Sequence, residues 1–188
     1  GLVNENGEFD DRPATVGYRY FRDKSLHSQI RQEIRAQFER FEATGLQMDH
    51  VNGHLNFHLH PTVFDIFRRH YHEWGVTAMR VTRDPFMMNF RLALGRYFYR
   101  ASHAFIFNRL SARAVPSLQR RGIRHTDAVF GLLQNDRITE DYILKLLDNL
   151  WPGDFELYCH PDEEAHAHET EALCSPRVRE KIAERGIE

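Results

Sequence analysis

The chain has 188 residues, of which 41% are hydrophobic, and this length suits one sizeable core, so we expect a single domain over residues 1–188. The 25 Lys and Arg residues nearly balance the 27 Asp and Glu residues, which argues against nucleic acid as a partner. Only two cysteines are present, and we find neither a signal peptide nor an apolar run of membrane-spanning length. We therefore expect a reducing, cytoplasmic location.

Residues 1–23 are polar and rich in turn formers, and we expect them to form a loop. From Ser25 onward, apolar residues recur every three to four positions, which predicts an amphipathic helix that stops near Gly45. Residues 48–60 alternate instead, with apolar residues at odd positions and polar residues at most even ones. This alternation predicts a strand with one apolar and one polar face.

Further helices and strands are expected to alternate after this segment. Pro61 suits the first turn of a helix that ends at Gly75, and a short strand is expected over 76–81. Residues 86–126 contain eight arginines, no acidic residue and many aromatic residues. We expect them to form one or two basic helices, a helical insertion over 86–124.

Two more strands and further helices complete the expected order. The strands are expected over 128–130 and 155–159, and Thr139 is expected to cap a helix that reaches Leu150. The remainder is expected to be helical, with the last helix starting at Ser175. Strands that alternate with helices predict a parallel α/β sheet with helices outside. About four strands are too few for a complete (β/α) barrel, which needs roughly 250 residues.

Histidine is the unusual component, with 12 residues, and four of them lie at even positions within residues 50–60. His54 and His58 project to the same side whether the segment is a strand or a helix, because their spacing suits both periods. Zinc and related ions bind imidazole nitrogens, completed by a carboxylate and an open position in catalytic sites. The segment therefore predicts a functional site. The alternative is a polar strand face whose histidines bond the backbone or solvent.

The same segment carries a family resemblance. Residues 49–61 read Asp-His-Val-Asn-Gly-His-Leu-Asn-Phe-His-Leu-His-Pro, which resembles the histidine-rich segment of YdjC-like carbohydrate deacetylases. The form is most similar to the branch associated with hopanoid biosynthesis (HpnK-type). Further similar blocks follow in the family's order at 78–85, 129–132, 156–161 and 175–179.

This resemblance implies an α/β fold that is part of a distorted (β/α) barrel of the glycoside hydrolase/deacetylase type. It implies hydrolytic N-deacetylation of an N-acetylated amino-sugar, with a hopanoid-linked glycan as one substrate. It also implies a divalent metal ion, which could be Mg, Zn, Co or Ni, held by one Asp and two His. Only one of these ligands maps here, onto His54. The motifs for the other ligands and the general base would precede Gly1, so we expect the N-terminal strands to be absent and the chain alone to be inactive.

The remaining site residues are carried over in the same way. The resemblance implies that His160 protonates the departing amine, and that His58, His60 and Arg80 contact the substrate. An alternative for His160 is a polar residue that merely ends a strand. Arg80 could instead form a buried ion pair with Asp84.

Three further alternatives stay open. The basic segment 86–124 suits peripheral contact with an anionic membrane, as a lipid-linked substrate would require, but also helices packed on the barrel or a contact in a homo-oligomer. His166 and His168 lie among acidic residues, which suits either a second metal site or a solvated lid. The protein could also be another metal-dependent amidohydrolase, a catalytically incomplete remnant or a carbohydrate-binding module.

Overall fold

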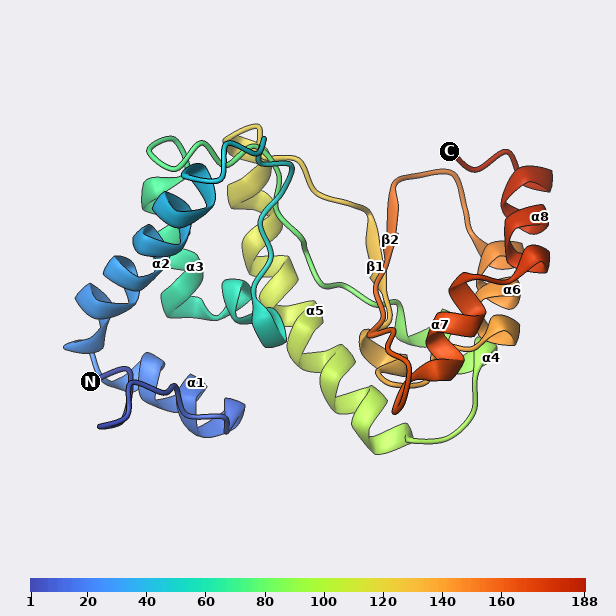
Figure 1. Ribbon diagram of the computed structural model, residues 1–188, viewed down its shortest axis with the longest axis horizontal. Coiled ribbons are helices and arrows are strands. Elements are labelled where there is room, and N and C mark those ends of the chain that lie inside the picture. The colour runs from blue at the N-terminus through green and yellow to red at the C-terminus, as the bar shows by residue number, and fades with distance from the viewer. The chain divides into compact units, whose positions relative to one another are not determined.

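The computed structural model describes residues 1–188, and the chain in it divides into two compact units (Figure 1). The first unit comprises Gly1–Val81 and Leu110–His125, and the second comprises Thr82–Arg109 and Thr126–Glu188. Helix α5 (Tyr97–Arg120) runs from the second unit into the first. The expectation of one domain over the whole chain stays a prediction.

The first unit is mostly helical. Its complete helical elements are α1 (Pro13–Arg22), α2 (Leu26–Glu42), the short 3-10 helix η1 (His54–Leu59) and α3 (Pro61–His70). Helix α3 packs against the other three. The ring of Phe38 on α2 stacks on Trp74 at 5.1 Å between centroids, and Phe67 on α3 meets the same indole edge-on at 5.7 Å. These contacts join α2 to α3 and to the turn that follows it.

The expected loop over residues 1–23 is wrong for its second half, which forms α1. Pro13 occupies the first turn, where a missing backbone N–H leaves no hydrogen bond unmade and where its fixed φ suits the helix. Val16 is buried and Tyr20 is half-buried, so the spacing of four places both on the packed face. The turn-forming residues that suggested a loop end just before Pro13.

The expected strand over 48–60 is also wrong beyond its start. Val51 makes a single parallel bridge with Met79, and the chain then turns into η1. Leu55 and Asn56 have φ values of 51° and 58°, in the left-handed region that a strand cannot contain. The expected strand over 76–81 likewise forms only single parallel bridges, one of them between Ala78 and Arg124.

The second unit combines helices with a small sheet. Its elements are α4 (Phe86–Leu92), the start of α5, β1 (Ala128–Phe130), η2 (Leu132–Gln134), α6 (Glu140–Asn149), β2 (Phe155–Leu157), α7 (Ala167–Leu173) and α8 (Pro176–Glu184). Strands β1 and β2 pair in parallel, with Val129 opposite Glu156. The mixed α/β class is confirmed, and the one or two helices expected within 86–124 are the two helices α4 and α5. The sheet has two strands rather than about four.

Helix α6 organises the core of this unit and packs against α4, α7 and α8 (Figure 1). Its buried residues recur at helical spacing on one face: Tyr142, Ile143, Leu146 and Leu147. The hydroxyl of Thr139 accepts a hydrogen bond from the Tyr142 N–H at 3.2 Å, which confirms the predicted cap. Ser175 caps α8 in the same way. No helix is both long and apolar enough to cross a bilayer.

Candidate functional site

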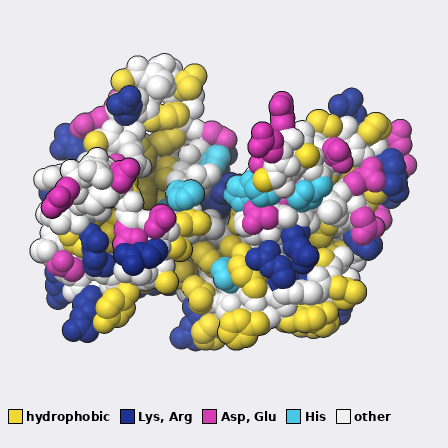
Figure 2. Space-filling view, turned by 60° about the horizontal axis from the view of Figure 1, so that its bottom comes forward, with side chains coloured by type: hydrophobic (Ala, Val, Ile, Leu, Met, Phe, Trp, Pro, Cys, Tyr) yellow, Lys and Arg dark blue, Asp and Glu magenta, His cyan; other side chains and the backbone are white.

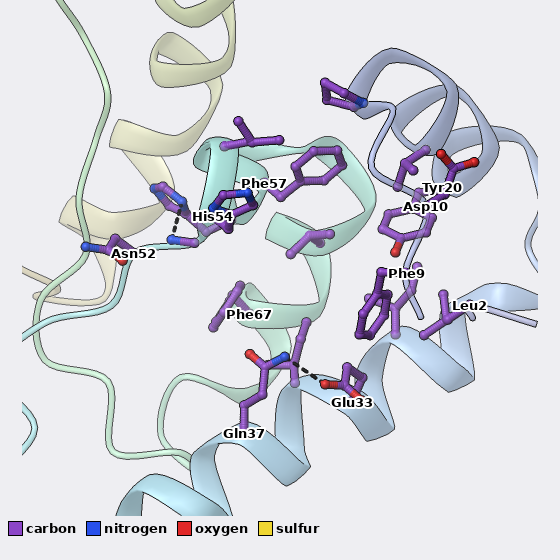
Figure 3. Close-up of a pocket in the computed structure, with 18 of the residues that line it drawn as sticks. Leu2, Phe9, Asp10, Tyr20, Glu33, Gln37, Asn52, His54, Phe57 and Phe67 are labelled. Carbon is purple, nitrogen blue, oxygen red and sulfur yellow. Dashed lines mark hydrogen bonds between the residues drawn. The ribbon is translucent and has the colours of Figure 1, made fainter. Parts of the chain in front are cut away.

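His54 begins η1 and lies on the rim of a cavity of about 390 Å³ in the first unit (Figure 3). Its side chain is exposed and makes no hydrogen bond within the chain. Both ring nitrogens of this imidazole are therefore available to a ligand. His54 and His58, which the sequence predicted to share one side, both contribute to the cavity wall.

His58 differs from His54 because it is buried, with 2% of its surface exposed. Its Nδ1 accepts a hydrogen bond from the Gly53 N–H at 2.9 Å, and its Nε2 lies 2.9 Å from the Arg80 carbonyl oxygen, to which it must donate. Burial lowers the pKa of this imidazole to about 4, so the ring is neutral at pH 7. His58 braces the turn that presents His54, and direct contact with a substrate stays a prediction.

His60 also serves the backbone. Its Nε2 lies 3.0 Å from the Gly17 carbonyl oxygen, and its Nδ1 accepts from the Thr62 N–H at 3.3 Å. The ring thereby joins α1 to the start of α3, and burial lowers its pKa. Neither His60 nor Arg80 belongs to the cavity wall, and Arg80 is half-buried. Their predicted substrate contacts stay predictions.

The cavity wall is mainly apolar and aromatic. Phe9, Tyr20, Phe57 and Phe67 contribute rings, and Asp10 is one of a few polar groups (Figure 3). A hydrogen bond from the Arg12 guanidinium lowers the Asp10 pKa to about 2, so this carboxylate is ionised at neutral pH. Because residues 1–23 were expected to form a loop, the contribution of α1 to the cavity wall was not predicted. The four-residue spacing of Val16 and Tyr20 after Pro13 is the sequence pattern that would have predicted this helix.

His160 lies three residues beyond β2 in the second unit, and a buried carboxylate fixes its backbone. Glu169 on α7 is fully buried, and its two oxygens accept different backbone N–H groups. Oε2 accepts from His160 at 2.7 Å, and Oε1 accepts from Ile138 at 3.0 Å. One side chain therefore ties the end of β2 to the turn before α6.

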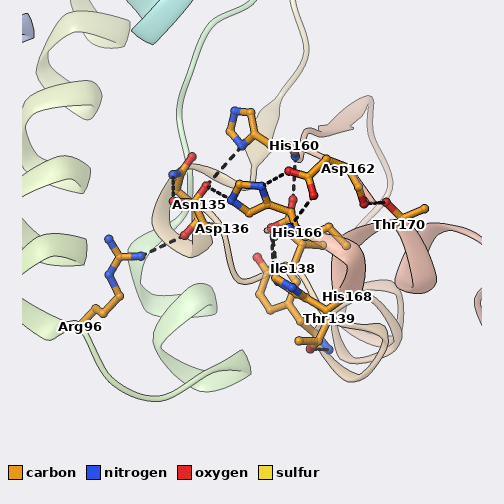
Figure 4. A network of polar contacts seen from close by, with 12 residues as sticks. Arg96, Asn135, Asp136, Ile138, Thr139, His160, Asp162, His166, His168 and Thr170 are labelled. Atoms are coloured by element: carbon orange, nitrogen blue, oxygen red, sulfur yellow. Dashed lines mark hydrogen bonds and ion pairs between the residues drawn. The ribbon is translucent and has the colours of Figure 1, made fainter. Parts of the chain in front are cut away.

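That turn carries Asp136, whose φ of 61° lies in the left-handed region. Asp136 Oδ1 lies 3.7 Å from His160 Nδ1 and 3.4 Å from His166 Nε2 (Figure 4). His166 Nδ1 is also 2.7 Å from Asp162 Oδ2. The hydrogen bond with Asp162 is the largest cause of a raised His166 pKa, which favours an imidazolium between two carboxylates. Figure 2 shows such histidine and acidic side chains adjoining on the surface.

Sequence reasoning placed His160 in the site but missed Asp136 and Glu169. Asp136 precedes His160 by 24 residues, and Glu169 lies on a later helix, so neither stands in a local motif with it. Residues 161–166 form a loop before α7, and His166 in it is held by ion pairs with Asp136 and Asp162. A role of this loop as a solvated lid stays a prediction. The only sequence signal was the concentration of acidic residues around His166 and His168.

The metal ion implied by the family resemblance can be tested against the donor set. Within residues 1–188 no three His, Cys, Asp or Glu side chains are arranged to hold a metal ion. The exposed, unpartnered imidazole of His54 fits the role of one ligand, because nitrogen donors of this kind suit zinc and related ions. His54 belongs to the first unit and His160 to the second.

The parallel strand pair, the histidine-bearing turn and the strand-end histidine characterise a mixed α/β protein with a histidine-based site. The model of the YdjC-like protein family matches residues 1–184, and the chain belongs to this family. A carbohydrate deacetylase of Geobacillus stearothermophilus is 27% identical over 201 aligned residues, covering 100% of this chain and 65% of that protein. One from Danio rerio is 30% identical, covering 70% and 41%, and one from Mus musculus is 26% identical, covering 85% and 60%.

A solved structure shares the fold. A proposed cellobiose-phosphate cleavage protein from Enterococcus faecalis V583 superposes with a TM-score of 0.63 at 22% identity, covering 98% of this chain and 65% of the other. The chain thus spans about two thirds or less of the length of the proteins it matches.

Proposed function

We propose that this chain carries part of the active site of a metal-dependent carbohydrate deacetylase, which hydrolyses the N-acetyl group of an amino-sugar. The match to the YdjC-like family over residues 1–184 carries the proposal, because relatives from a bacterium and two vertebrates are all named carbohydrate deacetylases. The exposed imidazole of His54 at the cavity rim and the buttressed His160 supply two groups that such a reaction uses.

His54 is proposed as one ligand of a divalent metal ion. Such an ion, when bound, activates water for attack and polarises the amide carbonyl. The contribution of this chain is to hold the imidazole in place. His58 does so through both ring nitrogens. Its Nδ1 accepts from the N–H of Gly53, the residue directly before His54, and its Nε2 donates to the Arg80 carbonyl oxygen. The aromatic wall next to His54 suits a sugar ring, whose C–H faces pack on aromatic side chains.

His160 is proposed as the proton donor to the departing amine. The carboxylate of Asp136 lies 3.7 Å from Nδ1, which favours the tautomer with a proton there and leaves Nε2 without a hydrogen-bond partner in the chain. As the amide C–N bond breaks, Nε2 of the imidazolium gives its proton to the amine nitrogen, while the acetyl carbon keeps the oxygen taken from water. The products are acetate and the free amino-sugar. Asp136 and Glu169 are positioning residues in this scheme.

Two finer proposals rest on the residue pattern. The segment 49–61 supports placement in the branch associated with hopanoid biosynthesis, with an amino-sugar on a hopanoid lipid as substrate. The parallel pairing of β1 with β2, and the parallel bridges of Val51 and Ala78, support a distorted (β/α) barrel of the deacetylase type.

Acetate release from N,N′-diacetylchitobiose, measured with the protein loaded with Zn, Co, Ni or Mg, tests the proposal. His160→Gln is expected to lower kcat by roughly 100-fold or more with little change in KM, as loss of a general acid does. Asp136→Asn is expected to lower kcat less and to alter its pH profile.

His168→Gln is the matched control, because this half-buried neighbouring histidine makes no hydrogen bond and lies 3.9 Å from Glu169 and 6.4 Å from the His166 ring centroid. It should retain activity. Undiminished turnover in the His160 variant would exclude the proposed proton donor. No acetate release from any N-acetylated sugar by any metal-loaded form would exclude the deacetylase itself.

A further inference from the structure

The tip formed by α4, the turn after it and the start of α5 exposes large apolar side chains. All of them belong to the second unit. Phe98 is 89% exposed and Leu94 is 79% exposed, the two highest values among the exposed large hydrophobic residues of the chain. The rest of this apolar tip consists of Met87, Phe90, Tyr97, Phe105 and Ile106. A concentration of exposed large apolar side chains of this kind is typical of an interaction site.

The helix period places several of these side chains in one stripe. On α5, Phe98 and Phe105 are seven residues apart and therefore share a face, and Arg109 follows Phe105 by one turn. The Arg109 guanidinium lies 5.9 Å from the Phe105 ring centroid. On α4 and the turn, Phe90 packs on Tyr97 at 5.6 Å between centroids. Aromatic rings therefore lie beside cationic groups along the tip.

The charge on this tip has a single sign. Arg91, Arg96 and Arg109 are exposed, and no Asp or Glu occurs anywhere in residues 86–126. In Figure 2, hydrophobic side chains gather along the lower edge of the molecule, with basic side chains beside them. If two copies met through this tip, arginines would face arginines without acidic partners from the segment, which disfavours self-association. The partner should therefore be anionic and apolar at once.

We propose that the apolar tip of α4 and α5 docks on an anionic lipid surface. The aromatic and aliphatic side chains would enter the boundary between headgroups and acyl chains, while the arginines keep their charges among the lipid phosphates. Leu94, in the turn between the helices, and Phe98, at the start of α5, would penetrate furthest. The inference rests on the exposed residues alone and does not depend on the proposed deacetylase activity.

Vesicle flotation of the purified protein tests this inference. The vesicles are neutral phosphatidylcholine, or phosphatidylcholine mixed with anionic phosphatidylglycerol, each at low and at high salt. We expect flotation with the anionic vesicles that weakens as salt rises. Phe98→Ser with Phe105→Ser should weaken binding about tenfold or more, since both side chains would leave the lipid.

Charge reversal at Arg91 and Arg109 should also weaken binding at least tenfold, because each basic residue near an anionic surface contributes roughly a fivefold gain in affinity. The controls lie in the first unit. Tyr18→Ser with Phe21→Ser removes aromatics that are 62% and 65% exposed, and reversal of Arg31 and Arg40 makes the same charge change on α2. Both control variants should float like the wild-type protein.

Several results would overturn the inference. Two of them concern the wild-type protein alone, namely no flotation with anionic vesicles and equal flotation with neutral ones, so neither depends on a variant that folds. Equal losses in the tip and control variants, with unchanged circular dichroism spectra, would show that the tip is not the contact. Sedimentation velocity tests for self-association. If the protein self-associates, the Phe98 and Phe105 changes abolish this, and no vesicle binding is seen, the tip is an interface between copies instead.

Discussion

Replacing His58 by alanine is expected to destabilise the first unit by about 3–5 kcal/mol at pH 7. The ring is 2% exposed and bonds the Gly53 N–H and the Arg80 carbonyl, both at 2.9 Å. Its removal leaves a void and deprives the part-buried Gly53 N–H of its acceptor. A buried donor without an acceptor costs about 1–3 kcal/mol by itself, and the void adds to that cost.

The same ring makes stability depend on pH in a defined direction. Burial lowers the His58 pKa from 6.5 to about 4 in the folded protein. In acid the unfolded chain therefore binds a proton before the folded chain does. The stabilisation is fully present above about pH 6.5 and is lost as pH falls toward about 4. The difference between the two pKa values corresponds to roughly 3 kcal/mol.

Urea unfolding near pH 7 and near pH 4.5 measures both effects. Trp74 lies in the first unit and Trp151 in the second, so a Trp151→Phe background lets Trp74 fluorescence report the first unit. The His58 variant should be less stable than its parent near pH 7 and should lose less stability on acidification. Burial also lowers the His60 pKa, so a smaller acid dependence should remain.

The reasoning would be refuted if the His58→Ala protein lost as much stability as its parent between these two pH values. It would also be refuted by an unchanged unfolding midpoint at neutral pH. A control at His54, which makes no hydrogen bond within the chain, should change neither quantity by more than about 0.5 kcal/mol, as is usual for surface substitutions.

Three further changes concern the second unit. Gly131→Ala should lower stability by about 2 kcal/mol or more in urea unfolding, because φ there is 116° and the added Cβ would overlap the Tyr158 carbonyl oxygen. Thr139→Ala should cost about 1 kcal/mol in the same assay through loss of the α6 cap, whereas Thr139→Ser should be nearly neutral. Glu169→Gln should lower the free energy of unfolding by about 1–3 kcal/mol, because a side-chain amide has only one acceptor oxygen for the two N–H groups. Hydrogen exchange of the His160 amide should also accelerate.

Local signals explain which parts of the fold could be predicted. Pro61 opens α3, Thr139 caps α6 and Ser175 caps α8, as expected from the sequence. A cap needs only a hydrogen bond to a residue two or three positions away, so the sequence contains the whole interaction. The parallel pairing of β1 with β2 was also expected, since strand and helix alternate there.

The segment 48–60 could not be predicted because a tertiary contact overrides its period. Alternation of apolar and polar residues indicates a strand when all the polar residues, here those at even positions, face water. Here the even-numbered His58 turns inward, and its bonds to Gly53 N–H and the Arg80 carbonyl fold the chain into η1. Arg80 lies 22 residues away along the chain, so nothing within the segment reveals that bond.

The histidines themselves show how far residue counting can locate a site. A surplus of histidine suggested a metal site, yet His58 and His60 each use both ring nitrogens on backbone groups and have lowered pKa values. Such rings are neutral structural braces. His54 and His160 are exposed, and each has at least one ring nitrogen without a hydrogen-bond partner in the chain. The availability of a ring nitrogen, rather than membership of the histidine-rich segment, is therefore what distinguishes the residues able to bind a metal ion or to transfer a proton.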